Sequence, residues 1–579
     1  MKFIAPKLTE GPDISNVPNL KCLVLQNCTN LRRIHPSIGI HKKLTILNLS
    51  GCENLTSLPS KFEIECLTEF GLTGCSKLTE IPEFGRNMKR VKRLYVSDTP
   101  ITTLPTSIEH LTNLDVLIVN GCKNLVHLPD TIFNLKLVRR VSFQFSPKLD
   151  RLPENLGNAE SLKELDLSNT AIRKVPSSIH LLKNLEWLFI YNCEGLSMPL
   201  PFNSMPTSPH PIDLLFYSLS LSPASSLYWL VLTDCNLKAI PNDIGSLFSL
   251  KDLRLSRNDF DCLPESIIQL SKLKRLELNN CTSLRSLPKL PLNIECVEAV
   301  GCISLEMLPD PLKPSDSLEP SLNLENCVKL VDNQSCTDWF ISGIKKSLKL
   351  SPSLPLSVPK ESYNIVFPGS EIPEWFSHQN MGKEMKIKLP SHLCKNVGIA
   401  FCVVFCTNDL HSFPIYGYSL IANGKRIYID YISSPSIDNV PSDHVSLVYV
   451  VPQYLDEESN KLLWEGDVNG FSQIRIKIES SDVKVKKWGI RMIYNEDIKD
   501  LDRTMVQNSN SSITPYDGMD VVHHNFDHSS VAVEGSSDYN MAGPNGEGSS
   551  NCEEPSEYED CDWEESSESD LDYYKNFFF

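Results

Sequence analysis

Residues 44–59 read LTILNLSGCENLTSLP, and this pattern of one cysteine among spaced leucines returns along the first half of the chain. Successive copies begin 21 to 24 residues apart, except for one step of 42. A period of this size with this pattern predicts a leucine-rich-repeat solenoid, in which short parallel strands form a horseshoe of about twelve coils. The first residue of each copy is Leu20, Leu44, Leu67, Val91, Leu114, Val138, Leu162, Leu185, Leu227, Leu250, Leu273 or Ile294.

Each copy has a strand-forming part and an outer part. The leucines three and five residues after the start, such as Leu47 and Leu49, alternate with polar residues. This period of two predicts a short strand whose leucines point inward and stack on the next coil. Because the Leu-Pro step that closes each copy removes a backbone donor, we expect an irregular or 3₁₀ outer arc rather than a long helix.

Cysteine usage fits the same repeat. About half of the nineteen cysteines fall at one position of the pattern, once per coil, as Cys52 does. They are therefore predicted to be small buried residues and not disulfide partners. No cysteines or histidines show the close pairing of a structural zinc site, and the sequence predicts no metal or other cofactor.

The composition and sequence patterns divide the chain into four parts. Residues 1–335 form the solenoid, with an inserted loop near 197–226 that carries apolar Leu214, Leu215 and Phe216. Residues 336–362 are a helical connector, in which a helix from Thr337 to Leu350 closes the solenoid. Residues 503–579 are rich in Asn, Ser, Gly and acidic residues, a composition that predicts a disordered acidic tail.

The remaining part, residues 363–502, contains eight short runs of apolar and β-branched residues separated by turn signals. This arrangement predicts an all-β sandwich. The expected strands are Ile365–Phe367, Met385–Leu389, Ile399–Phe405, Tyr416–Ala422, Arg426–Ile432, Val445–Val451, Ile474–Ile478 and Ile490–Tyr494.

The charge of the chain is uneven. Residues 551–579 carry eleven acidic residues and one Lys, so they contribute −10 of the net charge of −17. The remainder is too mildly acidic and lacks the broad cationic surface that nucleic acid or an anionic membrane requires, so neither is an expected partner. No apolar run approaches the roughly 20 residues of a membrane span, and Met1 to Pro6 lack a secretory signal. We expect a cytoplasmic protein that also has access to the nucleus.

The first residues have the form of an incomplete coil. Lys7 to Asp13 resemble the second half of a repeat whose strand is missing, and no polar segment covers Leu20. A solenoid needs capped ends, so we expect the chain to be the downstream part of a longer protein or a truncated product.

Two sets of motifs resemble a known family. The cysteine-bearing repeats, with Asp98 to Ile101 and Leu104 to Ile108, resemble those of plant TIR, NB-ARC and leucine-rich-repeat disease resistance proteins. A second motif resembles the opening of the C-terminal jelly-roll and immunoglobulin-like domain (C-JID) that follows such repeats. It comprises Pro368, Gly369, Ser370, Glu371, Ile372, Pro373, Glu374, Trp375 and Phe376.

The resemblance implies a function. In this family the repeats and the C-terminal domain recognise a pathogen effector protein, and upstream TIR and NB-ARC domains assemble and hydrolyse NAD. The sequence contains neither a GxxxxGK[ST] phosphate loop nor a counterpart of the TIR glutamate, so we expect no enzymatic activity from it. The upstream domains are expected partners in a full-length receptor.

Candidate partner-binding residues come from positions two, four and six of each copy, which should face the concave side. An aromatic group has two alternative interpretations: it is an anchor for a partner, or Leu214 to Phe216 cover it. A charged flank likewise either contacts the partner or is solvated strand surface. The aromatic group comprises Trp187, Phe189, Tyr191 and Trp229, and the flank comprises Arg93, Tyr95, Arg140, Glu164, Asp166, Asp252, Arg254, Arg275 and Glu277.

In the C-terminal part, Glu371, Glu374 and Trp375 are expected to form a structural turn, since Pro368 and Pro373 lie in the same short stretch. Ser370, Glu374 and His378 lack the strand-to-helix elbow of a nucleophile. The loops at 411–416 and 433–444 are additional candidates for partner contact.

Two other functions compete with intracellular recognition. An extracellular leucine-rich-repeat receptor for a peptide or protein would explain the glycosylation sequons at Asn27, Asn48, Asn54 and Asn280. A substrate adaptor for ubiquitin transfer would use the same solenoid, but the chain shows no ligase-docking motif.

Overall fold

The chain is described by a computed structural model that divides into residues Met1–Val522 and His523–Phe579. The predicted disordered tail and most of the two candidate loops lie outside the described residues. The residues that the structure describes are 7–196, 211–221, 226–310, 320–330, 333–350, 363–376, 378–381, 384–390, 397–407, 415–422, 425–433, 443–450, 471–480 and 483–494.

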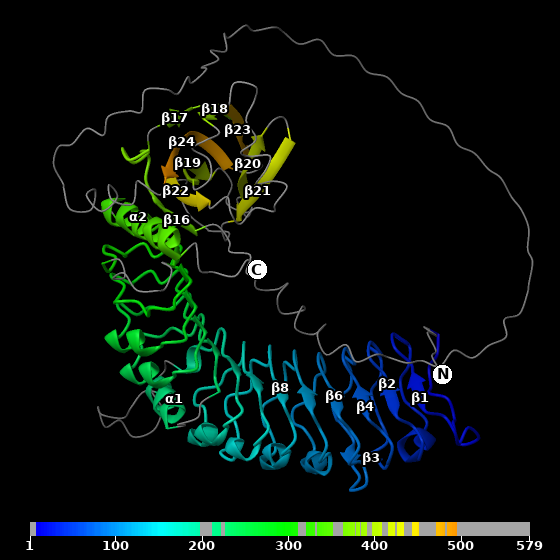
Figure 1. Cartoon of the computed structure of the whole chain (residues 1–579). Coiled ribbons are helices and arrows are strands. Elements are labelled where there is room, and N and C mark those ends of the chain that lie inside the picture. Colours follow the sequence, from blue (N-terminus) through cyan, green and yellow to red (C-terminus); the bar gives the residue numbers. More distant parts are fainter. Residues whose placement is uncertain are drawn as a thin grey trace, which may run out of the picture. The chain divides into compact units, whose positions relative to one another are not determined.

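A ladder of short parallel strands runs through the first part (Figure 1). Each strand pairs with the next in strict register, so Leu188 of one coil lies beside Leu165 and Leu230 of its neighbours. The predicted solenoid is confirmed. Its strands are β1 (Cys22–Val24), β2 (Ile46–Asn48), β4 (Glu69–Gly71), β6 (Arg93–Tyr95), β7 (Val116–Ile118), β8 (Arg140–Ser142), β9 (Glu164–Asp166), β10 (Trp187–Phe189), β11 (Trp229–Val231), β12 (Asp252–Arg254), β13 (Arg275–Glu277), β14 (Cys296–Glu298) and β15 (Ser321–Asn323).

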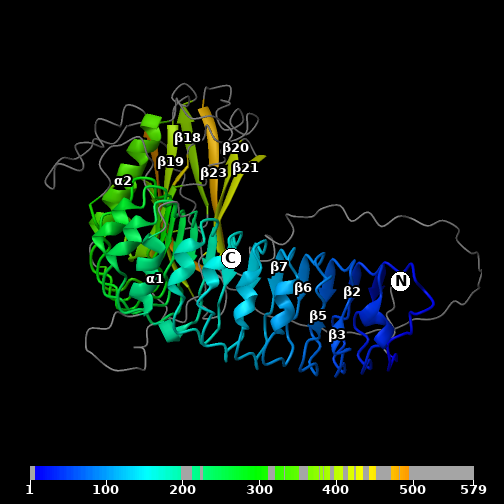
Figure 2. The same ribbon diagram turned by 90° about the horizontal axis from the view of Figure 1, so that it is seen from below.

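Short 3₁₀ turns line the outer side of the coils (Figures 1 and 2). Most of them begin directly after a proline, such as Pro105 or Pro241, whose backbone is extended. The predicted 3₁₀ outer arc is therefore confirmed. The turns are η1 (Pro36–Ile40), η2 (Thr106–His110), η3 (Asp130–Asn134), η4 (Leu156–Asn158), η5 (Ser177–Leu181), η6 (Glu194–Leu196), η7 (Asn242–Ser246) and η8 (Glu265–Gln269), with a two-stranded parallel pair β3 (Lys61–Phe62) and β5 (Glu83–Phe84) in the same layer.

The repeated cysteines are buried, as predicted, and they also make hydrogen bonds. Cys193 Sγ donates to the carbonyl oxygen of Leu167 in the preceding coil at 3.2 Å, and Cys281 Sγ donates to Leu255 O at 3.2 Å. Where the repeat has Asn258 instead, its amide donates to Leu232 O at 2.7 Å. This position thus needs a small side chain with a donor, because the carbonyl groups after each strand are buried.

The inserted segment near 197–226 contains a helix, α1 (Pro211–Ser220), where the sequence predicted a loop. The helix packs against η5 and η7, in the outer layer of the solenoid. Leu215 and Phe216 are buried there. Leu214 to Phe216 therefore do not cover the concave aromatic residues, and that alternative is wrong. The apolar side of α1 instead packs into the core from the outer layer of the solenoid.

After β15 comes α2 (Asn333–Leu350), which begins four residues before the helix that the sequence predicted. Lys345 and Lys346 of this helix are buried. Strand β16 (Tyr363–Pro368) then pairs with β15 in parallel, with Leu322 beside Ile365. The same strand pairs antiparallel with β22 (Asp443–Val450), so the ladder of the repeats continues into the C-terminal part.

The described residues of the C-terminal part form two antiparallel sheets. The sheet that β16 and β22 enter continues through β19 (Val397–Thr407), β24 (Val483–Tyr494) and β17 (His378–Asn380). The second sheet has the order β18 (Glu384–Pro390), β23 (Phe471–Ser480), β20 (Ile415–Ala422) and β21 (Lys425–Ser433). Each of the eight predicted strands has a counterpart, and β17 is additional.

The burial of the cysteines gives a test of the stacked core. Burial raises the pKa of the thiols, for Cys52 and Cys75 to about 12, and the thiolate is the reactive form. We expect the eleven buried cysteines among the described residues to resist an aromatic disulfide reagent at pH 8 until denaturant is added, whereas the exposed Cys262 reacts at once. A Cys262→Ser variant should lose one fast-reacting thiol. Rapid reaction of all nineteen thiols of the native chain would contradict the stacked core.

Candidate functional site

The strict register places equivalent residues of successive coils side by side on the inner surface. Trp187 of β10 lies between Glu164 and Trp229, and Asp252 follows Trp229. Phe189 lies between Asp166 and Val231. The structure therefore brings together three of the four predicted aromatic residues.

These residues form an aromatic cluster, defined here as Trp187, Phe189, Tyr228 and Trp229. The rings of Trp187 and Tyr228 lie edge to face with centroids 5.1 Å apart, and those of Phe189 and Trp229 lie 5.6 Å apart in the same geometry. Such pairs contribute about 0.5–1.5 kcal/mol beyond burial. The four side chains are half-buried, so the cluster is partly open to a partner.

Tyr228 was not among the predicted residues, because it lies one position after the start of its copy, beside the positions counted as concave. A search for aromatic residues at every position of the coil would have found it. Tyr191 is half-buried, but the structure gives its ring no contact with the cluster.

Two cations lie over the aromatic rings. The guanidinium carbon of Arg254 lies 4.9 Å from the centre of the Trp229 ring, and Lys251 Nζ lies 5.5 Å from that of Tyr228. Cations at these distances are attracted to the ring faces. Arg254 is predominantly buried, whereas Lys251 is exposed.

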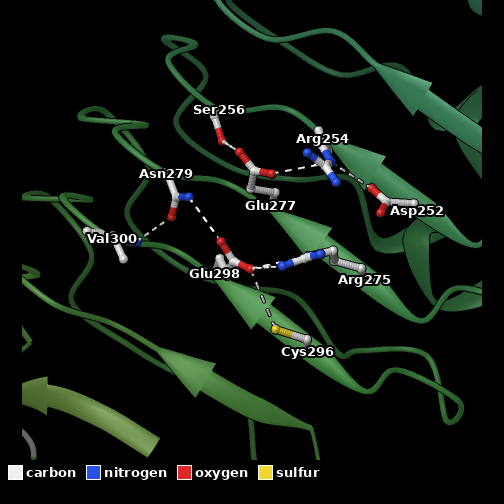
Figure 3. Close-up of polar contacts among 9 residues, drawn as sticks. All are labelled: Asp252, Arg254, Ser256, Arg275, Glu277, Asn279, Cys296, Glu298 and Val300. Carbon is white, nitrogen blue, oxygen red and sulfur yellow. Dashed lines mark hydrogen bonds and ion pairs between the residues drawn. The ribbon is translucent and has the colours of Figure 1, made fainter. Parts of the chain in front are cut away.

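A network of ion pairs continues from the cluster toward β14 (Figure 3). Arg254 lies between Asp252 at 3.1 Å and Glu277 at 3.4 Å, and Arg275 pairs with Glu298 at 2.6 Å. Ser256 Oγ donates to Glu277 at 2.7 Å. Burial raises the pKa of Glu277, and Arg254 opposes that rise.

On the other side of the cluster, Arg140 pairs with Glu164 at 3.0 Å and Lys163 pairs with Glu186 at 2.8 Å. Asp166 is completely buried and accepts hydrogen bonds from Gln144 Nε2 and the Ser168 backbone. Burial raises the pKa of Asp166 to about 6.

The structure therefore corrects the prediction for the charged flank at two residues. Asp166 cannot touch a partner directly, and Arg254 is not solvated strand surface, because both side chains are covered by neighbouring coils. Of the remaining charges of β8, β9, β12 and β13, Asp252 pairs with Arg254 of its own strand, and the others pair across coils. Two predicted residues lie far from the cluster: Arg93 and Tyr95 are on β6, and β7, β8 and β9 separate that strand from β10. Arg93 lies 3.8 Å from Glu69.

The family motif at Pro368 to Phe376 has a structural role. Ile372 and Phe376 are buried, and the Trp375 ring lies 5.0 Å from Phe376 and 6.2 Å from Phe340 of α2. Arg491 lies 4.8 Å from the Trp375 ring. The motif thus holds the C-terminal sheets against the helix that follows the repeats.

No catalytic arrangement emerges there. Ser370 and Glu374 are exposed, and Glu371 forms an ion pair with Lys487 at 2.5 Å. Within the described residues, no three His, Cys, Asp or Glu side chains gather as a metal site. Among the helices that the structure describes, none has the length and apolar character to cross a bilayer.

Together, the fold and the C-terminal sheets define a leucine-rich-repeat protein with a C-JID domain, since residues 367–499 match the C-JID family model. The chain is 33% identical over 430 residues to the disease resistance-like protein DSC1 of Arabidopsis thaliana and 29% identical over 517 residues to the TMV resistance protein N of Nicotiana glutinosa. It is 27% identical over 442 residues to the disease resistance protein RPS4B of Arabidopsis thaliana. The resemblance to plant disease resistance proteins is thereby confirmed.

These alignments cover 69%, 85% and 70% of this chain but 33%, 41% and 34% of the three relatives. The chain thus spans about a third to two-fifths of the length of the curated relatives it matches. Among solved structures, the leucine-rich-repeat protein LIC12759 of Leptospira interrogans aligns with 52% of this chain and 89% of its own, at 22% identity and a TM-score of 0.30.

The raised pKa of Asp166 predicts a pH-dependent effect on stability. Its pKa is about 6 in the folded chain and about 3.8 when unfolded, so the folded form holds the proton more tightly. The contribution of this group to stability is therefore greatest below pH 4 and is lost as pH rises through 6. We expect Asp166→Asn to raise the free energy of unfolding at pH 8, by on the order of 1–3 kcal/mol, and to change it little at pH 4.

Urea unfolding of both proteins at the two pH values measures this effect. Asp259→Asn is the matched control, because bonds from Lys238 and Ser283 lower the pKa of that carboxyl. That variant should gain no stability at pH 8. A lower unfolding midpoint for Asp166→Asn at pH 8 than for the wild type would show that the buried carboxylate stabilises the fold.

Proposed function

We propose that this chain is the recognition region of an intracellular plant immune receptor and binds a pathogen effector protein. The aromatic cluster on the inner face of the solenoid is the observation that supports this assignment. Large aromatic side chains dominate the binding energy of protein interfaces, and α1, which could have covered these, lies in the outer layer instead. The names of the relatives, which are disease resistance proteins, agree with this role.

In this proposal the C-terminal part is a jelly-roll and immunoglobulin-like domain that supplies further contacts. TIR and NB-ARC domains act upstream of the region in a full-length receptor, and the region itself performs no catalytic step. It works in the cytoplasm or nucleus, without nucleic acid or membrane as a ligand.

The extracellular alternative receives no support from the sequons. The side-chain amide of Asn54, which a glycan would modify, donates to Thr29 O of the preceding coil at 2.7 Å. A glycan on this nitrogen would replace one of its two hydrogens and would have to fit beside that bond, against the preceding coil. We therefore do not adopt the extracellular receptor.

Trp187 is the residue to change in a test of this proposal. Trp229 is less suitable, because its indole nitrogen is buried and Arg254 lies on its ring, so its removal also disturbs the fold. We expect Trp187→Ala to weaken effector binding by at least about 30-fold, roughly 2 kcal/mol. Phe248→Ala is the matched control, since Phe248 is exposed two residues after the end of η7 in the outer layer.

The full chain would be immunoprecipitated from plant tissue challenged with a pathogen, and a bound pathogen protein would be identified and purified. Its affinity for the wild-type chain and both variants would then be measured by calorimetry. Equal affinities for the wild type and Trp187→Ala would remove the aromatic cluster from the binding surface. Absence of any pathogen protein from the precipitate would contradict the proposed function.

A further inference from the structure

At the aromatic cluster, aromatic contacts replace the ion pairs that join successive coils. In the row of residues one position after the start of each copy, Lys163 pairs with Glu186 at 2.8 Å and Lys274 pairs with Glu295 at 2.7 Å. Between these pairs lie Tyr228 and Lys251. Lys163 and Lys274 each pair with a carboxylate of the following coil, whereas the residue that follows Lys251 in this row is Lys274. Lys251 instead contacts the ring of Tyr228 in the preceding coil.

Lys251 is the exposed cation beside the cluster that has no acidic partner among the described residues. Its ammonium group lies 5.5 Å from the centre of the Tyr228 ring, which places it at the edge of the aromatic cluster. A cation that is already held over a ring loses little further freedom when a carboxylate arrives.

Tyr228 adds a second donor at the same edge. Its hydroxyl makes no hydrogen bond with any described residue. Burial, together with Glu186 and Glu164, raises the pKa of Tyr228 to about 12, so the hydroxyl keeps its proton and can donate. The open groups at this edge are thus donors, and they suit an acceptor on the partner.

The neighbouring carboxylates are already engaged. Glu164 and Glu186 expose 16% and 23% of their side chains and pair with Arg140 and Lys163. On the other side, Arg254 is bound between two carboxylates (Figure 3). A basic group on a partner would have to compete with these cations in half-buried positions, where breaking a pair is costly.

We propose that the aromatic cluster binds a segment of the partner protein in which an apolar side chain lies next to a carboxylate. The apolar side chain packs on Trp187 and Phe189, and the carboxylate pairs with Lys251 and accepts from the Tyr228 hydroxyl. This inference rests on the proposed function and specifies the chemistry of its partner.

A library of random dodecapeptides displayed on phage, selected on the full chain, tests the proposal. We expect the enriched peptides to carry Asp or Glu within two residues of Trp, Phe or Leu. Selection on Lys251→Glu should lose this preference and favour Lys or Arg at the same place, because the charge at the edge of the cluster is reversed. Lys21→Glu is the matched control: Lys21 is exposed at the equivalent position of the coil of β1, far along the ladder from the cluster, and the peptides selected on this variant should match those of the wild type.

The best wild-type peptide would then be measured by fluorescence anisotropy. We expect Lys251→Glu to weaken its binding at least tenfold and Lys21→Glu less than twofold. Raising the salt concentration should weaken its binding to the wild type, because the ion pair is exposed and screened. The thiol-protection pattern of each variant confirms that it is folded.

Three results would overturn the inference. These are peptides without acidic residues, equal binding to the wild type and Lys251→Glu, or no enrichment at all. Each leaves the proposed function open to its own test with a pathogen protein. If acidic peptides bind equally well to the wild type and Trp187→Ala, they bind away from the cluster, and the proposed site fails as well.

Discussion

The in-register stacking of three-residue strands is the constraint on which the rest of the structure depends. A single coil is too small to bury its own leucines, so each coil is stable only when its leucines lie against those of the coils before and after it. Leu165, Leu188 and Leu230 show this arrangement. Once they stack, the residues between them have no freedom of placement, and Trp187 must lie beside Trp229.

The same stacking decides what happens to the charges. Side chains of equivalent positions lie about one strand spacing apart, so opposite charges in successive coils pair across the ladder. Arg140 with Glu164 and Arg275 with Glu298 are examples. These groups are half-buried and already neutralised, and a partner gains little by contacting them. Aromatic side chains retain contact area that a partner can cover, so the inner face offers its binding energy at the cluster.

The repeats and the C-terminal part are joined by the same kind of interaction. Strand β16 adds to β15 in parallel and pairs on its other side with β22, so the last coil has no open strand edge. Backbone N–H of Asn326 donates to His444 Nε2 at 3.0 Å, and the Tyr363 ring stacks on Phe340 of α2 at 5.7 Å. The C-JID domain of this chain is thus continuous with the ladder of the repeats.

The sequence by itself determined the solenoid, its 3₁₀ outer arc, the buried cysteines and the positions of Trp187, Phe189 and Trp229, because in a repeat each residue's neighbours lie one period away. Only the tertiary structure decided the place of α1, the pairing of β15 with β16, the burial of Asp166 and Arg254, and the part played by Tyr228. These features depend on contacts that the period does not encode. The insertion that contains α1 interrupts the repeat, and a different fold begins after β15. The burial of Asp166 and Arg254 depends on how completely the side chains of neighbouring coils cover them.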